Sequence, residues 1–266
     1  MERLKNLTQS QLMIWTGQEL NPAVPLYNVI LKFDLFGSIN TACFKKAFEL
    51  LVQQSDAMRT VFTFNGGQPM QQVLEDIGGE LELLELSEQP DQAQLLQDWL
   101  LKQKQRNFDL SKRAFYSALI KLDSNHYVWY LNEHHAIIDA WGATTQYKAL
   151  SRFYHDLLQD KLEDIDYQLP KFDAFIKSQG QQLSGTAKKT IQEYWENKLK
   201  STPPALKLYG HSGQVLTTAS NRLTIELGET RSKRLRAMAI EDEFKTWTED
   251  LSIYNMFVTV LFAYLH

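Results

Sequence analysis

Strand-like and helix-like segments alternate along the first 160 or so residues of this chain, and few folds accommodate that order. Residues 27–36 alternate apolar and polar side chains as a half-buried strand does, and residues 44–52 repeat apolar side chains at helical spacing. The turn Asn65-Gly66-Gly67 predicts a hairpin between the apolar runs that flank it. The segments expected as strands are 27–36, 60–64, 70–74, 115–121 and 126–131, with a surface strand and loop at 75–91. The expected helices are 8–18, 40–52, 92–105 and one that ends near 158. The order predicts an α/β (α+β) two-layer sandwich, with a mixed sheet flanked by helices.

The second half of the chain has a weaker pattern. Residues 159–190 are polar and contain helix-breaking residues, so we expect a crossover there rather than part of a core. A helix containing Tyr194 and Trp195 follows. Residues 221–227 are expected as a strand, and residues 230–243 as an amphipathic helix.

The last segment, residues 254–266, is the most apolar helix of the sequence and has no terminating signal. We therefore expect that a further segment beyond His266 covered it, and that the chain is a truncated piece of a longer protein. The expected organisation is an N-terminal lobe at 1–160, a crossover with a helix at 161–205, and the beginning of a second, incomplete lobe at 206–266.

Composition argues against several classes of protein. Lys and Arg total 28 against 32 Asp and Glu, and the one dense basic stretch, 231–236, is followed at once by acidic residues, so we expect a solvated helix face and no nucleic-acid partner. The single cysteine, Cys43, excludes an internal disulfide and is expected as a packing thiol. The sequence has neither a signal-peptide pattern nor an apolar run long enough to span a membrane, so we expect a cytoplasmic protein without a membrane partner.

One cluster in the sequence has a chemical character, the run from His134 to Asp139 that follows an expected strand. Imidazole titrates near neutral pH, so His134 or His135 could take a proton from an attacking amine or hydroxyl. The intervening Ala-Ile-Ile is apolar and predicts a buried loop, in which Asp139 would be buried and would need a cationic or donor partner. Histidine pairs near strand ends are also found as hydrogen-bonded core residues, and that structural interpretation stays open here.

Two other kinds of site fit this cluster poorly. A metal would need more ligands than His134, His135 and Asp139, and the sequence has no His-x-x-x-His pair, so no metal is expected. A Ser-His-Asp hydrolase would need a Gly-x-Ser-x-Gly turn, which is absent, as are glycine-rich phosphate-binding loops.

The pattern His134-His135-x-x-x-Asp139 resembles the His-His-x-x-x-Asp-Gly motif of condensation domains from nonribosomal peptide synthetases. Other segments resemble further motifs of that family, in the family's order: Leu7-Thr8-x-x-Gln11-x-x-x-Trp15, Pro25-x-Tyr27-Asn28, Met58-Arg59-Thr60-x-Phe62, Gly67-x-Pro69-x-Gln71 and Tyr194-Trp195-x-x-x-Leu199. The resemblance covers the whole chain. It implies a chloramphenicol acetyltransferase-like fold of two lobes with the active site between them, of which this chain would hold the first lobe and the start of the second.

The resemblance also implies a reaction. A carrier-bound aminoacyl amine attacks a carrier-bound acyl or peptidyl thioester and forms an amide, without a directly bound cofactor, because phosphopantetheine of the carriers holds both substrates. The implied partners are donor and acceptor peptidyl carrier proteins and adjacent synthetase domains. Because the match begins within ten residues of Met1, the domain is expected to be first in its chain or of the starter type.

Residue roles follow from the same motif match. His135 is implied as the general base or the group that orients the amine, and His134 as a structural partner. Asp139 is expected to hold the loop through an ion pair with an arginine beyond the chain end. A backbone N–H among Ala140, Trp141 and Gly142 could stabilise the oxyanion, Trp141 could line the tunnel, and Arg59 is expected to be structural.

The chain departs from the family pattern at four positions, one of them Gln54, which stands where the second motif has an arginine. Ala140 replaces the motif glycine, Gly142 replaces a frequent serine, and Ser55 replaces the histidine of the second motif. These changes leave a non-catalytic carrier-recruitment module of the same fold as an alternative, and an epimerization domain or another His-x-x-x-Asp acyltransferase as a further one. A heterocyclization domain is disfavoured because its aspartate motif replaces the histidine pair. The isolated fragment is expected to be inactive.

Overall fold

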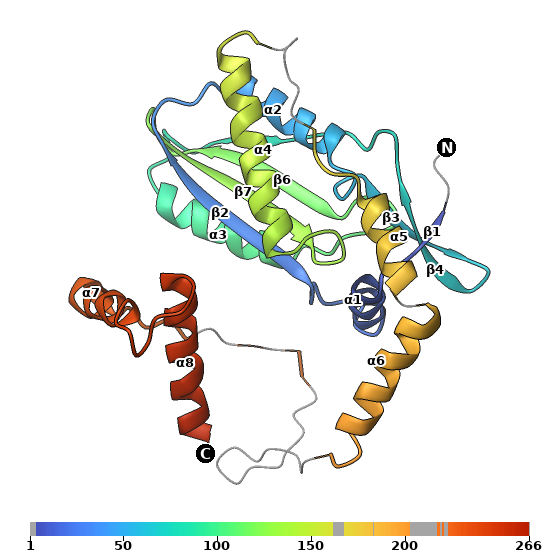
Figure 1. Cartoon of the computed structure of the whole chain (residues 1–266). Coiled ribbons are helices and arrows are strands. Elements are labelled where there is room, and N and C mark those ends of the chain that lie inside the picture. The colour runs from blue at the N-terminus through green and yellow to red at the C-terminus, as the bar shows by residue number, and fades with distance from the viewer. Residues whose placement is uncertain are drawn as a thin grey trace. The chain divides into compact units, whose positions relative to one another are not determined.

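A four-stranded sheet in the order β2-β7-β6-β5 lies in the larger of two compact units, Met1–Asn197 and Lys198–His266. The computed structural model describes residues 4–161, 168–182, 184–202, 217–218, 220 and 223–265. The strands of this sheet are β2 (Asn28–Phe36), β5 (Glu82–Glu85), β6 (Phe115–Lys121) and β7 (His126–His134). β7 pairs antiparallel with β2 and β6, whereas β5 pairs parallel with β6, so the predicted mixed sheet is confirmed (Figure 1).

A second, three-stranded sheet has the order β1-β4-β3. Its strands are β1 (Lys5–Asn6), β3 (Thr60–Asn65) and β4 (Gln68–Val73). Asn65 pairs with Gln68 across the two-residue turn Gly66-Gly67, and both glycines have positive φ, which a side chain would disfavour. The predicted hairpin is therefore confirmed at the predicted turn.

Helices cover both faces of the four-stranded sheet. Trp129 of β7 packs against Phe44 of α2 (Thr41–Gln54), with ring centroids 5.9 Å apart. The next residue, Tyr130, packs against Trp99 of α3 (Gln92–Lys104) at 5.0 Å. Because successive side chains of a strand point to opposite faces, α2 and α3 lie on opposite sides of the sheet. α4 (Ala140–Leu158) lies on the α2 side (Figure 1).

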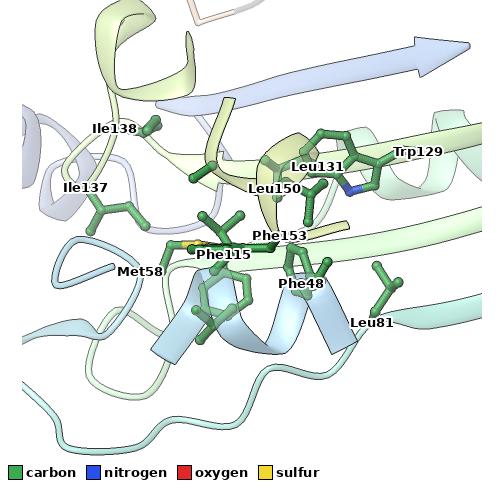
Figure 2. Close-up of a cluster of buried hydrophobic side chains, with 14 of the residues drawn as sticks. Phe48, Met58, Leu81, Phe115, Trp129, Leu131, Ile137, Ile138, Leu150 and Phe153 are labelled. Carbon is green, nitrogen blue, oxygen red and sulfur yellow. The ribbon is translucent and has the colours of Figure 1, made fainter. Parts of the chain in front are cut away.

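The main core lies between the sheet, α2 and α4. All five apolar residues predicted on one face of α2 are buried: Phe44, Ala47, Phe48, Leu51 and Val52. Figure 2 shows Phe48 next to Phe115 of β6 and Phe153 of α4, with Met58 at the side of the cluster. Cys43 is half-buried and packs at the edge of this core, in keeping with a packing thiol.

α1 (Gln9–Glu19) begins with a capping box, in which Thr8 and Gln11 each satisfy the other's backbone N–H. The stretch predicted as a polar crossover contains α5 (Phe172–Gln182) and the start of α6 (Gly185–Lys198). Among the described residues neither helix has a buried side chain, in keeping with a segment outside the core.

The smaller unit contains α7 (Gly228–Ala239) and α8 (Glu249–Leu265), joined by an ion pair of 2.6 Å between Arg236 and Glu249. The strand predicted at 221–227 is wrong for residues 223–227, which form no strand, while residues 221–222 lie outside the described residues. The alternation there is real, but no described segment of this unit provides a partner strand. α7 ends four residues before the predicted 243. None of the helices in the described ranges has the length and apolarity needed to cross a membrane.

Candidate functional site

The histidine pair lies where the central strand β7 meets helix α4. β7 runs three residues past the predicted end and includes His134, residues 135–137 form a turn, and Ala140 is the first residue of α4. Ile137 and Ile138 are buried and belong to the main core, and Figure 2 shows Ile137 next to Met58. The apolar residues between His135 and Asp139 therefore attach this connection to the core.

His134 is buried with both ring nitrogens in contact with the fold. Its Nδ1 accepts a hydrogen bond from the backbone N–H of Ala136 at 3.2 Å, and its Nε2 lies 3.3 Å from Oε1 of Gln18 in α1. Because Nδ1 accepts, the proton is on Nε2, which donates to Gln18. Burial lowers the pKa of His134 to about 4, so the ring is neutral at pH 7.

His135 is exposed, in contrast to its neighbour. Its backbone N–H donates to the carbonyl of Tyr27 at 2.8 Å, which fixes the main chain, and His135 lines a cavity of about 620 Å³. The cavity is bordered by α1, residues 55–60, the His135–Asp139 connection, the start of α4, and residues 169–175. His135 is thus the member of the pair that a molecule in this cavity could contact.

The prediction that Asp139 is buried is wrong: the residue is exposed. Its Oδ1 accepts a hydrogen bond of 2.7 Å from the backbone N–H of Gly142, which makes Asp139 the N-cap of α4. The physical reason is that Ile137 and Ile138 bury their own side chains, while the helix begins at the surface. Among the described residues the Asp139 carboxylate has no cationic partner.

The first residues of α4 were predicted as oxyanion donors. The Gly142 N–H is already bonded to Asp139, so it is not free to play that role. The N–H groups of Ala140 and Trp141 make no hydrogen bond within the described part of the chain, as expected for the first turn of a helix. Ala140 has a right-handed helical backbone without positive φ, so the β-carbon introduces no strain there. The Trp141 side chain is 81% exposed and borders the cavity.

Arg59 does not line this cavity itself, although its ion-pair partner Asp56 does. Its guanidinium forms a buried ion pair of 3.0 Å with Asp56 and donates to the carbonyls of Leu74 and Glu75. Lys171 binds the same Asp56 carboxylate at 3.2 Å. These contacts connect the start of β3 with the end of β4.

Sequence reasoning missed Glu133 and Gln146. Glu133 is fully buried on β7, and Nε2 of Gln146 in α4 donates to its Oε1 at 3.0 Å. Burial raises the pKa of Glu133 to about 7, and the Gln146 hydrogen bond only partly offsets this. Glu133 could have been found from the sequence, because it is an acidic residue inside the apolar run that leads to the histidine pair. Its partner Gln146, thirteen residues away on a helix, has no such sequence signal.

A profile of the family described as Condensation domain matches residues 1–266. Two curated relatives are an isonitrile lipopeptide synthase from Streptomyces coeruleorubidus, 26% identical over 92% of this chain, and a dimodular nonribosomal peptide synthase from Bacillus subtilis, 26% identical over 61%. The chain covers only 17% and 8% of these two proteins.

Solved structures give the same likeness. The starter condensation domain of rhizomide synthetase RzmA matches 77% of this chain with a TM-score of 0.70 and 22% identity. The first condensation domain of the calcium-dependent antibiotic synthetase matches 80% with a TM-score of 0.71 and 20% identity. The chain covers about half of each of these structures, 50% and 51%. The likeness confirms the predicted chloramphenicol acetyltransferase-like α/β fold.

Proposed function

Because the chain belongs to the condensation-domain family of nonribosomal peptide synthetases, we propose that it contributes the histidine side of an amide-forming active site. Condensation domains are acyltransferases that act on carrier-bound substrates. In the proposed reaction the amine of a carrier-bound aminoacyl group attacks the thioester carbonyl of a carrier-bound acyl or peptidyl group. The C–N bond forms, the C–S bond breaks, the amine loses a proton, and the donor carrier leaves as its thiol.

The observation that carries this proposal is the position of His135. This exposed residue borders a cavity of about 620 Å³, and the same cavity is bordered by Trp141 and Gly142 in the first turn of α4. A neutral imidazole there can accept the proton of the attacking amine or orient its lone pair toward the thioester. His134 cannot take this part in the present structure, because it is buried and both its ring nitrogens are engaged.

The oxyanion of the tetrahedral intermediate would be stabilised by the N–H groups of Ala140 and Trp141. Among the described residues these two N–H groups have no hydrogen-bond partner, and they lie at the positive end of the α4 dipole. Gly142 is not proposed as an oxyanion donor, because its N–H already donates to the capping carboxylate of Asp139. Asp139 and His134 are proposed to hold the loop rather than to touch the substrate.

The donor is proposed to be an acyl group of the starter type. A variant of the RzmA starter domain, similar in fold to this chain, has been solved in complex with C8-CoA and Leu-SNAC. We propose that its partners are donor and acceptor carrier proteins and adjacent synthetase domains, and that it is located in the cytoplasm. We also propose that the lobes divide at residues 160 and 205. The isolated 266-residue chain is proposed to be inactive alone.

The test is amide formation in the natural polypeptide that carries this domain, with an acyl-loaded donor carrier and an aminoacyl-loaded acceptor carrier, followed by mass spectrometry of the acceptor. His135→Ala is expected to lower the rate by about 10²- to 10⁴-fold. His155→Ala is the matched control, since His155 is an exposed histidine at the other end of the same helix. An unchanged rate in His135→Ala would contradict the assignment. Carrier binding without any amide product in the wild type would indicate a recruitment module instead.

A further inference from the structure

Glu133 is an acidic residue in an apolar environment. Its side chain lies inside the core beneath α4, and its register partners on the neighbouring strands are Val29 and Phe115. Within the described part of the chain, its carboxyl group accepts a single hydrogen bond, from the Nε2 of Gln146 at 3.0 Å. An ionised carboxylate is costly to bury with a single neutral donor.

Two oxygens of this pair have no donor. Glu133 Oε2 and Gln146 Oε1 are both buried, and neither has a hydrogen-bond partner among the described residues. If Glu133 were charged, both oxygens would be acceptors without a proton between them. A single proton on Glu133 Oε2 converts that atom into a donor for Gln146 Oε1, on the same amide that already donates to Oε1 of Glu133. One proton therefore satisfies both unpaired atoms.

We propose that Glu133 is a neutral carboxylic acid in the folded chain, forms a two-hydrogen-bond pair with the Gln146 amide, and through it positions the loop that carries His135. The raised pKa of Glu133, about 7, agrees with this protonation. The protonation of Glu133 concerns the folded structure and does not depend on the proposed function. The functional importance of the loop position rests on the role proposed above for His135.

The pair joins the two ends of the loop. Glu133 lies on β7 two residues before His135, and Gln146 lies on α4 seven residues after Asp139. The residues between them form the whole strand-to-helix connection. Gln146 also borders the cavity itself, so a displacement of its amide would move the cavity wall on which His135 lies. Glu133 and Gln146 act as positioning residues, since the Glu133 side chain does not reach the cavity.

The protonation is tested by isotope-edited infrared spectroscopy of the 266-residue chain, with Glu133→Gln as the difference control. We expect a protonated carboxyl band at pH 6 that disappears with a midpoint near pH 7 and is absent from Glu133→Gln. Glu133→Gln should fold, because an amide in place of the acid keeps both hydrogen bonds to Gln146. A carboxylate band at pH 6 that Glu133→Gln removes would overturn the proposal.

The positioning is tested by the NMR signals of the His135 backbone amide and imidazole. We expect these signals to be unchanged in Glu133→Gln at pH 6 and shifted in Gln146→Leu. Gln103→Leu is the matched control, because Gln103 is a buried glutamine on α3 away from the cavity, and it should leave His135 unchanged. If Gln146→Leu leaves the His135 signals in place, or Gln103→Leu shifts them equally, the positioning role is overturned. No turnover is measured, so failure here is distinct from failure of the proposed reaction.

Discussion

The Asp139 carboxylate accepts a hydrogen bond from the Gly142 backbone N–H at 2.7 Å, and this contact starts helix α4. The aspartate of the histidine motif is therefore an N-cap in this chain. The contact uses the third N–H of the helix and leaves the N–H groups of Ala140 and Trp141 unpaired in the described structure. The cap and the proposed oxyanion donors are thus consecutive positions of one helix end.

Asp139→Ala is expected to lower the free energy of unfolding by about 1 kcal/mol, because it removes the side-chain acceptor of the Gly142 N–H. Asp139→Asn should stay within a few tenths of a kcal/mol of the wild type, since asparagine caps helices as well as aspartate does. Urea denaturation of the two variants measures the difference. Equal losses in both would show that the charge of Asp139, rather than its capping oxygen, stabilises this chain.

Gly142→Ala is expected to destabilise the chain by about 1 kcal/mol, against the usual gain from alanine in a helix. A β-carbon at position 142 would lie 2.9 Å from Cδ1 of Ile138 and 3.2 Å from Oδ1 of Asp139, so it would press on a buried side chain and on the cap. Ile138→Val removes that Cδ1. In the Ile138→Val background the cost of Gly142→Ala should fall to near zero, and additivity of the two variants would contradict the contact.

Glu133→Gln is expected to stabilise the chain at alkaline pH. The folded pKa of Glu133, about 7, is raised above its ordinary value of 4.5, so the wild type loses stability as pH rises from about 4.5 to 7. The loss is at most about 3 to 4 kcal/mol, from about 1.4 kcal/mol for each of the roughly 2.5 pKa units. Thermal unfolding at pH 5 and pH 8 should therefore show little difference between variant and wild type in acid and a higher Tm for the variant in base. Equal Tm values at pH 8 would argue that Glu133 is not buried as described.

His134 should give the opposite dependence. Its folded pKa, about 4, is lowered from 6.5, so stability is present above pH 6.5 and is lost as pH falls toward 4. In the wild type, Glu133 lowers and His134 raises the free energy of unfolding as pH increases between about 4.5 and 6.5, so the two effects oppose each other. In Glu133→Gln the effect of His134 should be seen alone, as a loss of about 1.4 kcal/mol in the free energy of unfolding per pH unit of acidification. Adding His134→Gln should abolish this pH dependence. A slope that survives the second substitution would come from other groups.

Arg59→Met is expected to cost about 3 kcal/mol of unfolding free energy, because it leaves the buried Asp56 carboxylate with Lys171 alone and removes donors to Leu74 and Glu75. Lys171→Met should cost less than about 1 kcal/mol, because the Lys171 side chain is 64% exposed. Chemical denaturation of both variants makes the comparison. A larger loss from Lys171→Met would reverse this ranking of the two pairs.

Local patterns predicted much of the larger unit. The buried face of α2 and the Gly66-Gly67 turn depend on nearest neighbours along the chain, and both are as predicted. The alternation at 223–227 is equally local, yet no strand forms there, because a strand needs a partner that its own residues cannot specify.

The site was predicted less completely, for a physical reason. The sequence placed the histidine pair after a strand, but the opposite environments of His134 and His135 depend on contacts with Gln18 and Tyr27, more than 100 residues away. The exposure of Asp139 depends on which residues of the connection enter the core. The Glu133–Gln146 pair required the packing of α4 on β7, which spacing alone does not give.

The helical backbone at Ala140 has a consequence for how such chains are recognised. A residue at the first turn of a helix can carry any β-carbon that the neighbouring space allows, so the last letter of the His-His-x-x-x-Asp-Gly pattern is not a stereochemical requirement in this structure. A search that demands glycine there would pass over this sequence, although the strand end, the cap and the helix start are all in place. The informative part of the pattern is the spacing between the second histidine and the capping aspartate.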